Sequence, residues 1–393
     1  MAEWMSGGEL QMIGGTRCEL AGNGLVLLTS PSPRTGIYFV RAASSAGTAA
    51  SAYGNPNAAG GANAGASFSL PCSVRFAFRP IVLPPSGYEN IGNFCGYSIN
   101  INSTGTLWVG AGGAGGGANL GTGSLVCTVN NWYVVEMTVG VNVSGIVRFR
   151  YYADGQPAGS DAFPSFASAA GSGSYEIGTF GFAGTRFNAA AVTFDYDDMH
   201  VKEGANAYIG DGKIICLNMV DGPPYGTYTD YVPGSLIGGA SSIYQAWNNF
   251  PFTFGGANPP TYAGNTSALL QRQTIFHAHS GLAAGTTIKA MEICQLSAVN
   301  AGSIAFYNLY RVAGVDWYGT SGALTASTWV LWYDFYGGTL PTVAQMDACE
   351  IGIRADAGRT GGLGYYTGGC VLQVEYLVPP MTAAGKIQAR RKR

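Results

Sequence analysis

The sequence predicts an all-β chain of two sandwich domains with very little helix. Apolar and polar residues alternate along many segments, whereas the spacing of an amphipathic helix is almost missing. Glycine, asparagine, serine and proline interrupt these segments at intervals of roughly eight to twelve residues, which is typical of sandwiches and barrels. Charged residues make up only 11% of the 393 residues, whereas an ordinary domain has about 25%. The 47% of hydrophobic residues can form a core and exclude a disordered chain.

The first half of the chain contains several segments that alternate or are rich in β-branched residues, as strands are. We expect strands at 67–78, 96–102, 132–143, 147–153, 174–182 and 191–201. Asp154 and Gly155 follow one of these segments and predict a tight turn, because both residue types tolerate a positive φ. Two segments rich in glycine and alanine, 42–65 and 110–123, are expected to be long loops that contact neighbouring proteins.

A change in composition divides the chain into two domains. Residues 221–235 begin with Asp-Gly-Pro-Pro and indicate a linker. Downstream of it, strands are expected at 268–279, 286–296, 303–312, 329–335, 348–354 and 370–378. The sequence therefore predicts a first domain over 1–220, a second β-sandwich domain over 236–380 and a basic tail over 381–393.

Several motifs of the first domain carry a resemblance to a known family. One strand begins at Trp132, its partner ends at the turn of Asp154 and Gly155, and a later segment, 193–201, contains Phe-Asp-Tyr-Asp-Asp. Together they resemble the concanavalin A-like or laminin-G-like jelly roll. The segment that follows, 208–214, is similar to one found after this module in many tailed-bacteriophage virion proteins.

The resemblance implies a concanavalin A-like jelly roll followed by a second sandwich, in a structural protein of a phage virion. Such a protein would be a capsid decoration or tail-associated component, made in the host cytoplasm and found in the virion. Its partners would be copies of itself and other virion proteins. Host-surface glycan binding, as an adhesin or receptor-binding protein, is the first alternative, and glycoside hydrolysis is the second.

Asp195, Asp197 and Asp198 are the residues best suited to chemistry. Asp195 and Asp197 would point to one face of a strand, where two carboxylates about 5 to 5.5 Å apart could hydrolyse a glycoside with retention. Concanavalin-like glucanases use a Glu-x-Asp-x-x-Glu pattern, whereas this chain has Asp195-x-Asp197-x-x-His200. We therefore assign no catalytic residue and expect no enzyme. Calcium binding by the three carboxylates is a further possibility, and a hydrogen-bonded strand end is the simplest interpretation.

Aromatic residues of the second domain are candidate contact residues. Aromatic side chains concentrate in cores and subunit interfaces, and exposed ones can stack on the sugar rings of host-surface glycans. The candidates for an interface or a glycan site are Trp247, Phe250, Phe252, Trp329, Trp332 and Tyr336.

Charge is nearly balanced, with 20 basic and 22 acidic residues, but the last eight residues hold five positive charges. The body of the protein is mildly acidic, which argues against nucleic acid as a main partner. The tail is expected either to be solvated or to contact an acidic patch of a neighbouring subunit, through Arg390, Arg391, Lys392 and Arg393. We expect neither a signal peptide nor contact with a membrane, because long apolar runs are missing.

The sequence offers little evidence of a resident metal or nucleotide. Its eight cysteines lack the spacing of a zinc site, and buried free thiols or disulfides remain the two interpretations. His277 and His279 would share one face of a strand, where surface histidines are a simpler interpretation than a zinc pair. The GxGxxG pattern at 110–115 is not followed by a helix, so it predicts a loop rather than a phosphate site. Calcium is thus the one cofactor that we consider.

Overall fold

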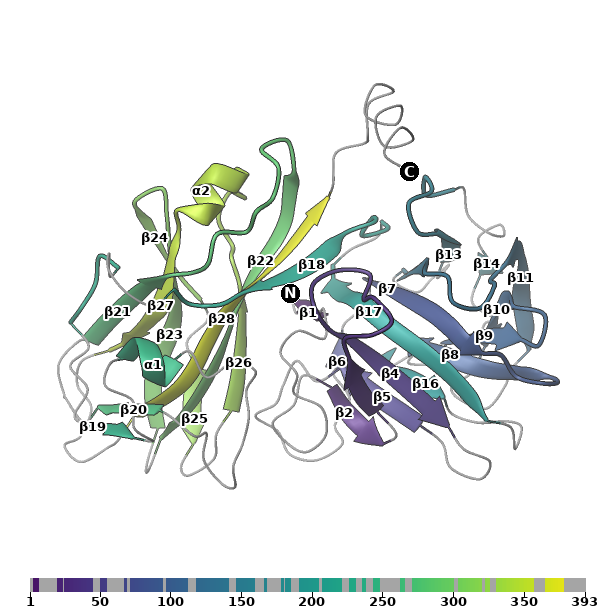
Figure 1. Cartoon of the computed structure of the whole chain (residues 1–393), viewed down its shortest axis with the longest axis horizontal. Coiled ribbons are helices and arrows are strands. Elements are labelled where there is room, and N and C mark those ends of the chain that lie inside the picture. Colours follow the sequence, from purple (N-terminus) through teal and green to yellow (C-terminus); the bar gives the residue numbers. More distant parts are fainter. Residues whose placement is uncertain are drawn as a thin grey trace.

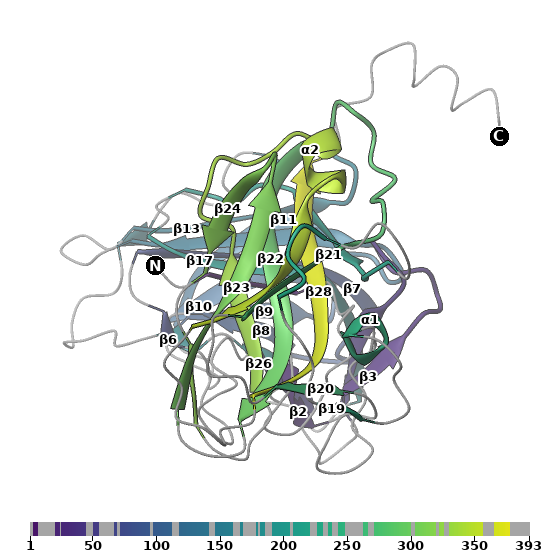
Figure 2. The same cartoon turned by 90° about the vertical axis from the view of Figure 1, so that its left-hand side faces the viewer.

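The computed structural model describes strands and short helices in both halves of the chain (Figures 1 and 2). The described residues are 3–6, 20–23, 25–44, 50–54, 67–68, 71–94, 97–111, 118–140, 146–159, 166–167, 178–179, 181–184, 191–204, 207–220, 226–230, 235–237, 243–247, 262–265, 271–299, 303–319, 322–325, 330–356 and 365–377. The prediction of an all-β chain, with a jelly-roll sandwich followed by a second β-sandwich and very little helix, is confirmed.

The first sandwich, on the right in Figure 1, consists of two large antiparallel sheets. Sheet I contains, in order, β14 (Phe166–Ala167), β13 (Ile146–Ala153), β12 (Tyr133–Val139), β7 (Cys72–Val82), β17 (Val192–Glu203), β4 (Phe39–Ser44) and β3 (Leu25–Leu28), with β1 (Glu3–Ser6) beside β17. Sheet II contains β11 (Asn119–Val126), β10 (Thr106–Ala111), β9 (Tyr97–Asn102), β8 (Tyr88–Phe94), β16 (Gly181–Gly184), β5 (Ala50–Gly54) and β2 (Leu20–Asn23). Two short strands, β6 (Ser67–Phe68) and β15 (Gly178–Thr179), pair with each other.

The second sandwich, on the left in Figure 1, also has two antiparallel sheets. Sheet III contains β19 (Ser235–Ile237), β20 (Tyr262–Asn265), β28 (Tyr365–Leu377), β22 (Thr287–Val299) and β26 (Val330–Phe335), with β18 (Lys213–Leu217) beside β28. Sheet IV contains β21 (Gln271–Phe276), β27 (Glu350–Ala355), β23 (Ser303–Val312) and β24 (Val315–Tyr318), with β25 (Gly322–Thr325) beside β23. The described helices are short, α1 (Ile243–Trp247) and α2 (Val343–Asp347), and none of them is long enough to cross a membrane.

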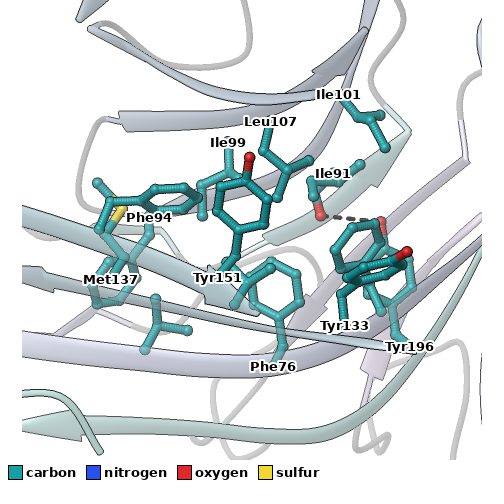
Figure 3. Close-up of a cluster of buried hydrophobic side chains, with 14 of the residues drawn as sticks. Phe76, Ile91, Phe94, Ile99, Ile101, Leu107, Tyr133, Met137, Tyr151 and Tyr196 are labelled. Carbon is teal, nitrogen blue, oxygen red and sulfur yellow. Dashed lines mark hydrogen bonds between the residues drawn. The ribbon is translucent and has the colours of Figure 1, made fainter. Parts of the chain in front are cut away.

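Each sandwich buries its own apolar core between its sheets. In the first, every second residue of a strand faces inward, as the strand period requires, and Phe76, Met137 and Tyr196 of sheet I meet Ile91 and Ile99 of sheet II (Figure 3). The Tyr196 hydroxyl donates to the Ile91 carbonyl oxygen over 3.0 Å, which gives this buried phenol a partner (Figure 3).

The core of the second sandwich is separate from that of the first. It includes Trp247 of α1, Tyr310 of β23 and Met346 of α2, none of which is exposed. The two short helices therefore cover the ends of this core rather than forming a layer of their own.

Three sequence expectations about boundaries and loops are corrected. The segment 42–65, expected to be a loop, contains strand β5, and 110–123 contains the first part of β11. Glycine and alanine are poor strand formers, but here pairing within sheet II holds them in strands. Strand β5 pairs with both β16 and β2, and strand β11 pairs with β10. Strand β18 lies before the predicted boundary at 220, yet it pairs with β28 of the second sandwich. The change of sandwich thus falls between β17 and β18, before the predicted linker 221–235.

Candidate functional site

The outer face of sheet I, which points away from the first core, is lined with charged residues. The strand register places Arg150, Glu136, Arg75 and His200 side by side across β13, β12, β7 and β17. In the same strands, the neighbouring residues in sequence, such as Phe76 and Met137, enter the core. Arg150 Nε donates to Glu136 Oε2 over 2.6 Å. Strand alternation thus places several charged residues on this outer face of sheet I, where Glu136, Arg75 and His200 are nevertheless buried.

Asp195 is held by two arginines from the strands on either side of it. Arg41 on β4 donates to both of its carboxylate oxygens over 2.6 and 3.0 Å, and Arg79 on β7 donates twice to Oδ2 over 3.0 and 2.8 Å. Asp195 is fully buried. The Arg79 guanidinium also lies over the rings of Phe39 and Trp132, at 4.9 and 4.5 Å. We call Asp195, Arg41 and Arg79 the Asp195 cluster.

Arg34 forms a second ionic centre, next to the strand bulge of β17. Its guanidinium donates to Asp198 Oδ2 over 2.7 Å, to Asp154 Oδ1 over 3.0 Å and to Asp211. It also donates to the Gly212 carbonyl oxygen over 3.1 Å. Burial alone would lower the pKa of Arg34, but the three carboxylates outweigh it and raise that pKa. The arginine is therefore a permanent cation that joins three separate segments of the chain.

Asp197 and Asp198 sit at an irregularity in the pairing of β17 with β7. Asp198 has a φ of 50°, a left-handed conformation that aspartate adopts more readily than most residues. Its Oδ1 accepts hydrogen bonds from Thr35 Oγ1 over 2.5 Å and from the Ile214 backbone N–H over 2.7 Å. Asp197 accepts backbone N–H groups of Arg34, Thr35 and Asp198. Burial, and then the charge of Asp198, raise the pKa of Asp197 well above its ordinary value.

A third group, which we call the junction cluster, joins the two sandwiches and consists of Arg75, His200 and Glu375. Arg75 donates to Glu375 Oε1 on β28, and His200 Nδ1 lies 2.8 Å from Glu375 Oε2. All three side chains are at most 2% exposed. Burial opposes the charge of Glu375, but Arg75 and His200 outweigh it and lower its pKa to about 2. The carboxylate is therefore ionised and bound by one sandwich while it belongs to the other.

Apolar contacts continue this junction. Met5 of β1, Ile214 of β18 and Ala290 of β22 form a buried cluster, against which Phe335 packs. The Phe335 ring also stacks on His200, with 6.2 Å between ring centroids and 10° between planes. The sandwiches are thus joined by ion pairs, apolar packing and the continuous path from β17 to β18 (Figure 1).

The three predicted acidic residues are therefore engaged inside the protein. Asp195, Asp197 and Asp198 are all fully buried, with arginines or backbone N–H groups on their oxygens. This environment leaves no open oxygen pair for a substrate, which argues against the hydrolase alternative. Within the described residues, no three His, Cys, Asp or Glu side chains come together as a metal site. Calcium binding stays a prediction that this geometry does not favour.

The aromatic candidates are divided between the core and segments outside the described residues. Trp247 is fully buried, and Tyr336 is half-buried with its ring 5.2 Å from Tyr310 and 5.7 Å from Trp317. Trp332 lies on β26, but its side chain is outside the described residues. The remaining aromatic candidates, Phe250, Phe252 and Trp329, lie outside the described residues. The candidate contact residues of the tail also lie outside them: Arg390, Arg391, Lys392 and Arg393.

His277 and five of the six described cysteines are buried, and Cys216 is half-buried. Six cysteines, 72, 127, 216, 294, 349 and 370, are free thiols, while Cys18 and Cys95 lie outside the described residues. His277 is buried, whereas we expected a surface histidine. Its Nε2 lies 2.9 Å from the Met346 carbonyl oxygen and 3.3 Å from Cys349 Sγ. Burial raises the pKa of the Cys349 thiol to about 12, so this pair lacks the thiolate of a cysteine nucleophile.

Sequence reasoning identified the acidic run but missed its basic partners. The strand Val74-Arg75-Phe76-Ala77-Phe78-Arg79 alternates large apolar residues with arginines, which is a signal that the opposite face is charged. Arg34 lies in no such pattern, whereas Glu375 alternates with Leu372, Val374 and Tyr376 along its strand. Arg34 reaches the site from a loop, and the alternation around Glu375 shows that it shares a polar face without showing which residues that face meets.

Comparisons with known proteins found solved structures of low similarity to this chain. No family model matches the sequence, and no curated protein matches it. Among solved structures, an endo-β-1,4-glucuronan lyase of the fungus Trichoderma reesei shares 12% identity over 47% of this chain and 89% of that one, with a TM-score of 0.33. A marine alginate lyase of Aplysia kurodai shares 12% identity over 46% and 87%, with a TM-score of 0.32.

The exoplasmic/lumenal domain of VIP36, bound to Ca²⁺ and Man3GlcNAc, shares 7% identity over 46% of this chain and 81% of that one, with a TM-score of 0.32. These three matches are two lyases and a sugar-bound domain, and none of them is described as a virion protein. At TM-scores and identities of this size, no ligand, activity or partner carries over to this chain.

Proposed function

We propose that this chain is a non-enzymatic structural protein of a phage virion, either a capsid decoration or a tail-associated component. It assembles with copies of itself and with other virion proteins, and it is found in the virion after synthesis in the host cytoplasm. The phage assignment depends on the sequence resemblance of residues 208–214 and of the strands before them. The non-enzymatic role is supported by the internal pairing of Asp195, Asp197 and Asp198.

The observation that carries the assembly role is the edge of sheet II. Strand β11 pairs with β10 and ends this sheet within the described part of the chain. Leu125, Val126 and Val129 at its end are 38%, 48% and 43% exposed, and the nearby Val82 is 44% exposed. An exposed edge strand with apolar side chains is a template for another protein segment. Natural proteins usually protect such edges with charge, so this edge suits a contact with another subunit.

The assembly role is tested by light scattering on the purified protein over a concentration series. We expect a concentration-dependent oligomer that Val126→Lys weakens at least about tenfold, because a lysine would be desolvated in the contact. Val315→Lys is the matched control, since Val315 is 68% exposed on β24 of the other sandwich. A wild-type chain that stays monomeric at high concentration and binds no virion protein would contradict the proposal.

Host-surface glycan binding is the competing outcome. The sequence predicts it from exposed aromatics, yet of the two candidates with described side chains Trp247 is buried in the second core and Tyr336 is half-buried against it. A glycan array or a cell-adsorption assay separates the two roles. Saturable binding to defined glycans by a monomer would favour the adhesin role over the structural one.

A further inference from the structure

A cavity of about 450 Å³ lies at one end of the second sandwich. Its walls come from α2, from the tip of the β23–β24 hairpin and from the segment 226–230. Both α2 and β24 lie at the upper end of this sandwich in Figures 1 and 2. Small residues leave the space between these walls open, namely Ala313, Gly314, Ala344 and Ala348.

The charged residues of the lining point away from the core of this sandwich. Arg311 and Glu350 are neighbours in the register of β23 and β27, while Tyr310 and Ile351, which adjoin them in sequence, enter the core. Arg311 Nη1 donates to Asp316 Oδ1 over 2.5 Å, and Arg311 Nε lies 3.9 Å from Glu350 Oε1. The arginine therefore lies between two carboxylates, which balance its charge.

Glu350 is held by hydrogen bonds from within the protein. Its Oε1 accepts from the Thr227 hydroxyl over 2.6 Å, and its Oε2 accepts from the Thr227 backbone N–H and the Thr274 hydroxyl, each over 2.5 Å. Glu350 is only 7% exposed. A cationic ligand therefore meets a carboxylate that is already engaged, and an anionic ligand would approach two carboxylates along with Arg311. These charges favour a neutral ligand.

The lining still has hydrogen-bonding groups to offer. A guanidinium carries several N–H donors in a planar fork, and within the described residues the Arg311 side chain donates through Nη1 alone. Gln345 Oε1 accepts from the Thr342 N–H and hydroxyl over 3.0 and 3.1 Å, which leaves its Nε2 donors for a ligand. The Thr227 hydroxyl donates to Glu350 and can still accept. Such groups, next to alanine methyl groups, match a compact molecule with hydroxyls on a carbon frame.

We propose that this cavity binds one or two units of a neutral saccharide, with hydroxyls held by Arg311 and Gln345 and a C–H face packed on Ala344 and Ala348. The volume lies within the roughly 300 to 1,000 Å³ of small-molecule sites. A peptide would bind along a strand edge or in a groove, whereas short separate pieces of chain line this cavity. The aromatic residues that the sequence suggested for glycan binding are not among the described lining residues. The site is also independent of the assembly surface on β11, which belongs to the other sandwich.

A glycan array of neutral and acidic oligosaccharides, incubated with the full chain, tests the site. Calorimetric titration with the neutral oligosaccharide of the strongest signal then measures the affinity. We expect saturable binding to neutral glycans. Binding to acidic glycans alone, or to none of the glycans, overturns the proposal. Failure here leaves the assembly role unchanged, because light scattering tests that role separately.

Two leucine substitutions show whether the bound glycan occupies this cavity. Ala344→Leu places a larger side chain on the exposed face of α2, where leucine is a good helix former, and should weaken binding at least about tenfold by filling the cavity. Ala284→Leu is the matched control, because Ala284 is also exposed but is not among the described lining residues. Arg311→Lys keeps the charge beside Asp316 but loses the planar fork, so it should also weaken binding. Unchanged binding in Ala344→Leu, or an equal loss in Ala284→Leu, would overturn the proposal.

Discussion

The Asp195 cluster and the junction cluster share one arrangement of charges but lie at different places in the molecule. In each, one buried carboxylate is held by two basic side chains, Asp195 by Arg41 and Arg79, and Glu375 by Arg75 and His200. The Asp195 cluster lies within sheet I, where its members are cross-strand neighbours. The junction cluster joins sheet I to β28 of the other sandwich. One ionic arrangement therefore fixes strands inside a domain, and the other fixes one domain against the next.

This difference predicts which part of the protein each cluster stabilises. Loss of the Asp195 carboxylate leaves two guanidiniums uncompensated inside a single folded unit. Loss of the Glu375 carboxylate weakens a contact between units that have separate cores. We therefore expect the first change to lower the stability of the first sandwich and the second to loosen the junction.

The largest effect is expected for Asp195→Ala. Removing one partner from a buried ion pair costs about 3 to 5 kcal/mol, because the remaining charges stay buried. Urea unfolding followed by fluorescence should therefore show the transition of the first sandwich at a lower midpoint. A loss of less than about 1 kcal/mol would show that Arg41 and Arg79 reach solvent without Asp195, and would contradict the cluster as described.

Acid should weaken the junction through Glu375. Its carboxyl has a pKa of about 2 in the folded protein, against an ordinary value of 4.5. A lowered pKa means that this stabilisation is complete above pH 4.5 and is lost as the pH falls toward 2. The shift corresponds to about 3 kcal/mol.

The measurement compares the wild-type chain with Glu375→Gln at several pH values. The stability difference between them should be largest above pH 4.5 and should shrink toward pH 2, because protonation makes the wild-type side chain as neutral as glutamine. A difference that stays constant over this range would contradict the ionised state of Glu375.

A smaller effect is expected from adding one methyl group at the junction. A Cβ at Gly212 would collide with Glu375 Oε1 and Arg75 Nη1. Gly212→Ala should therefore cost about 1 to 3 kcal/mol, the usual range for overpacking, and should make the chain between the sandwiches more sensitive to protease. Gly159→Ala is the matched control, since a Cβ there meets nothing within 4 Å. Equal protease resistance of the two variants would contradict tight packing at the junction.

The smallest effect is expected for an exposed ion pair. Arg272 Nε lies 2.8 Å from Asp230 Oδ2, with side chains 29% and 41% exposed. Asp230→Ala should change the free energy of unfolding by less than about 1 kcal/mol, because water and salt screen the pair. A cost similar to that of Asp195→Ala would show that burial does not distinguish the two sites.

The sequence predicted the strands of this protein better than its ionic contacts. The alternation in 303–312 identified β23 with the bounds that the structure has, and the pattern in 191–201 identified most of β17. Side-chain alternation is local, so a single sequence contains it. By contrast, Arg75 and Glu375 are separated by 300 residues, and only the packing of two sandwiches brings them together. The acidic run could therefore be recognised as polar, but not as buried.

Trp132 shows the same limit at a single position. It directly precedes β12, and tryptophan is a residue type that often anchors a core. Its ring instead lies under the Arg79 guanidinium and 6.2 Å from the Phe39 ring, beside the charged face of sheet I. A tryptophan predicts a large apolar contact. Which face of sheet I the Trp132 ring packs on depends on Arg79, which lies on another strand.

The pairing of β1 with β17, and the contacts of both with β28, have a consequence for how the chain folds during synthesis. Gln373 Nε2 donates to the Met5 carbonyl oxygen across a separation of 368 residues. Contacts of such long range form late, since they must wait for the intervening chain. As the ribosome releases the chain, β1 can pair with β17, but Met5 and Arg75 lack their partners Gln373 and Glu375 until β28 emerges. The aggregation risk of the nascent protein is highest in that interval.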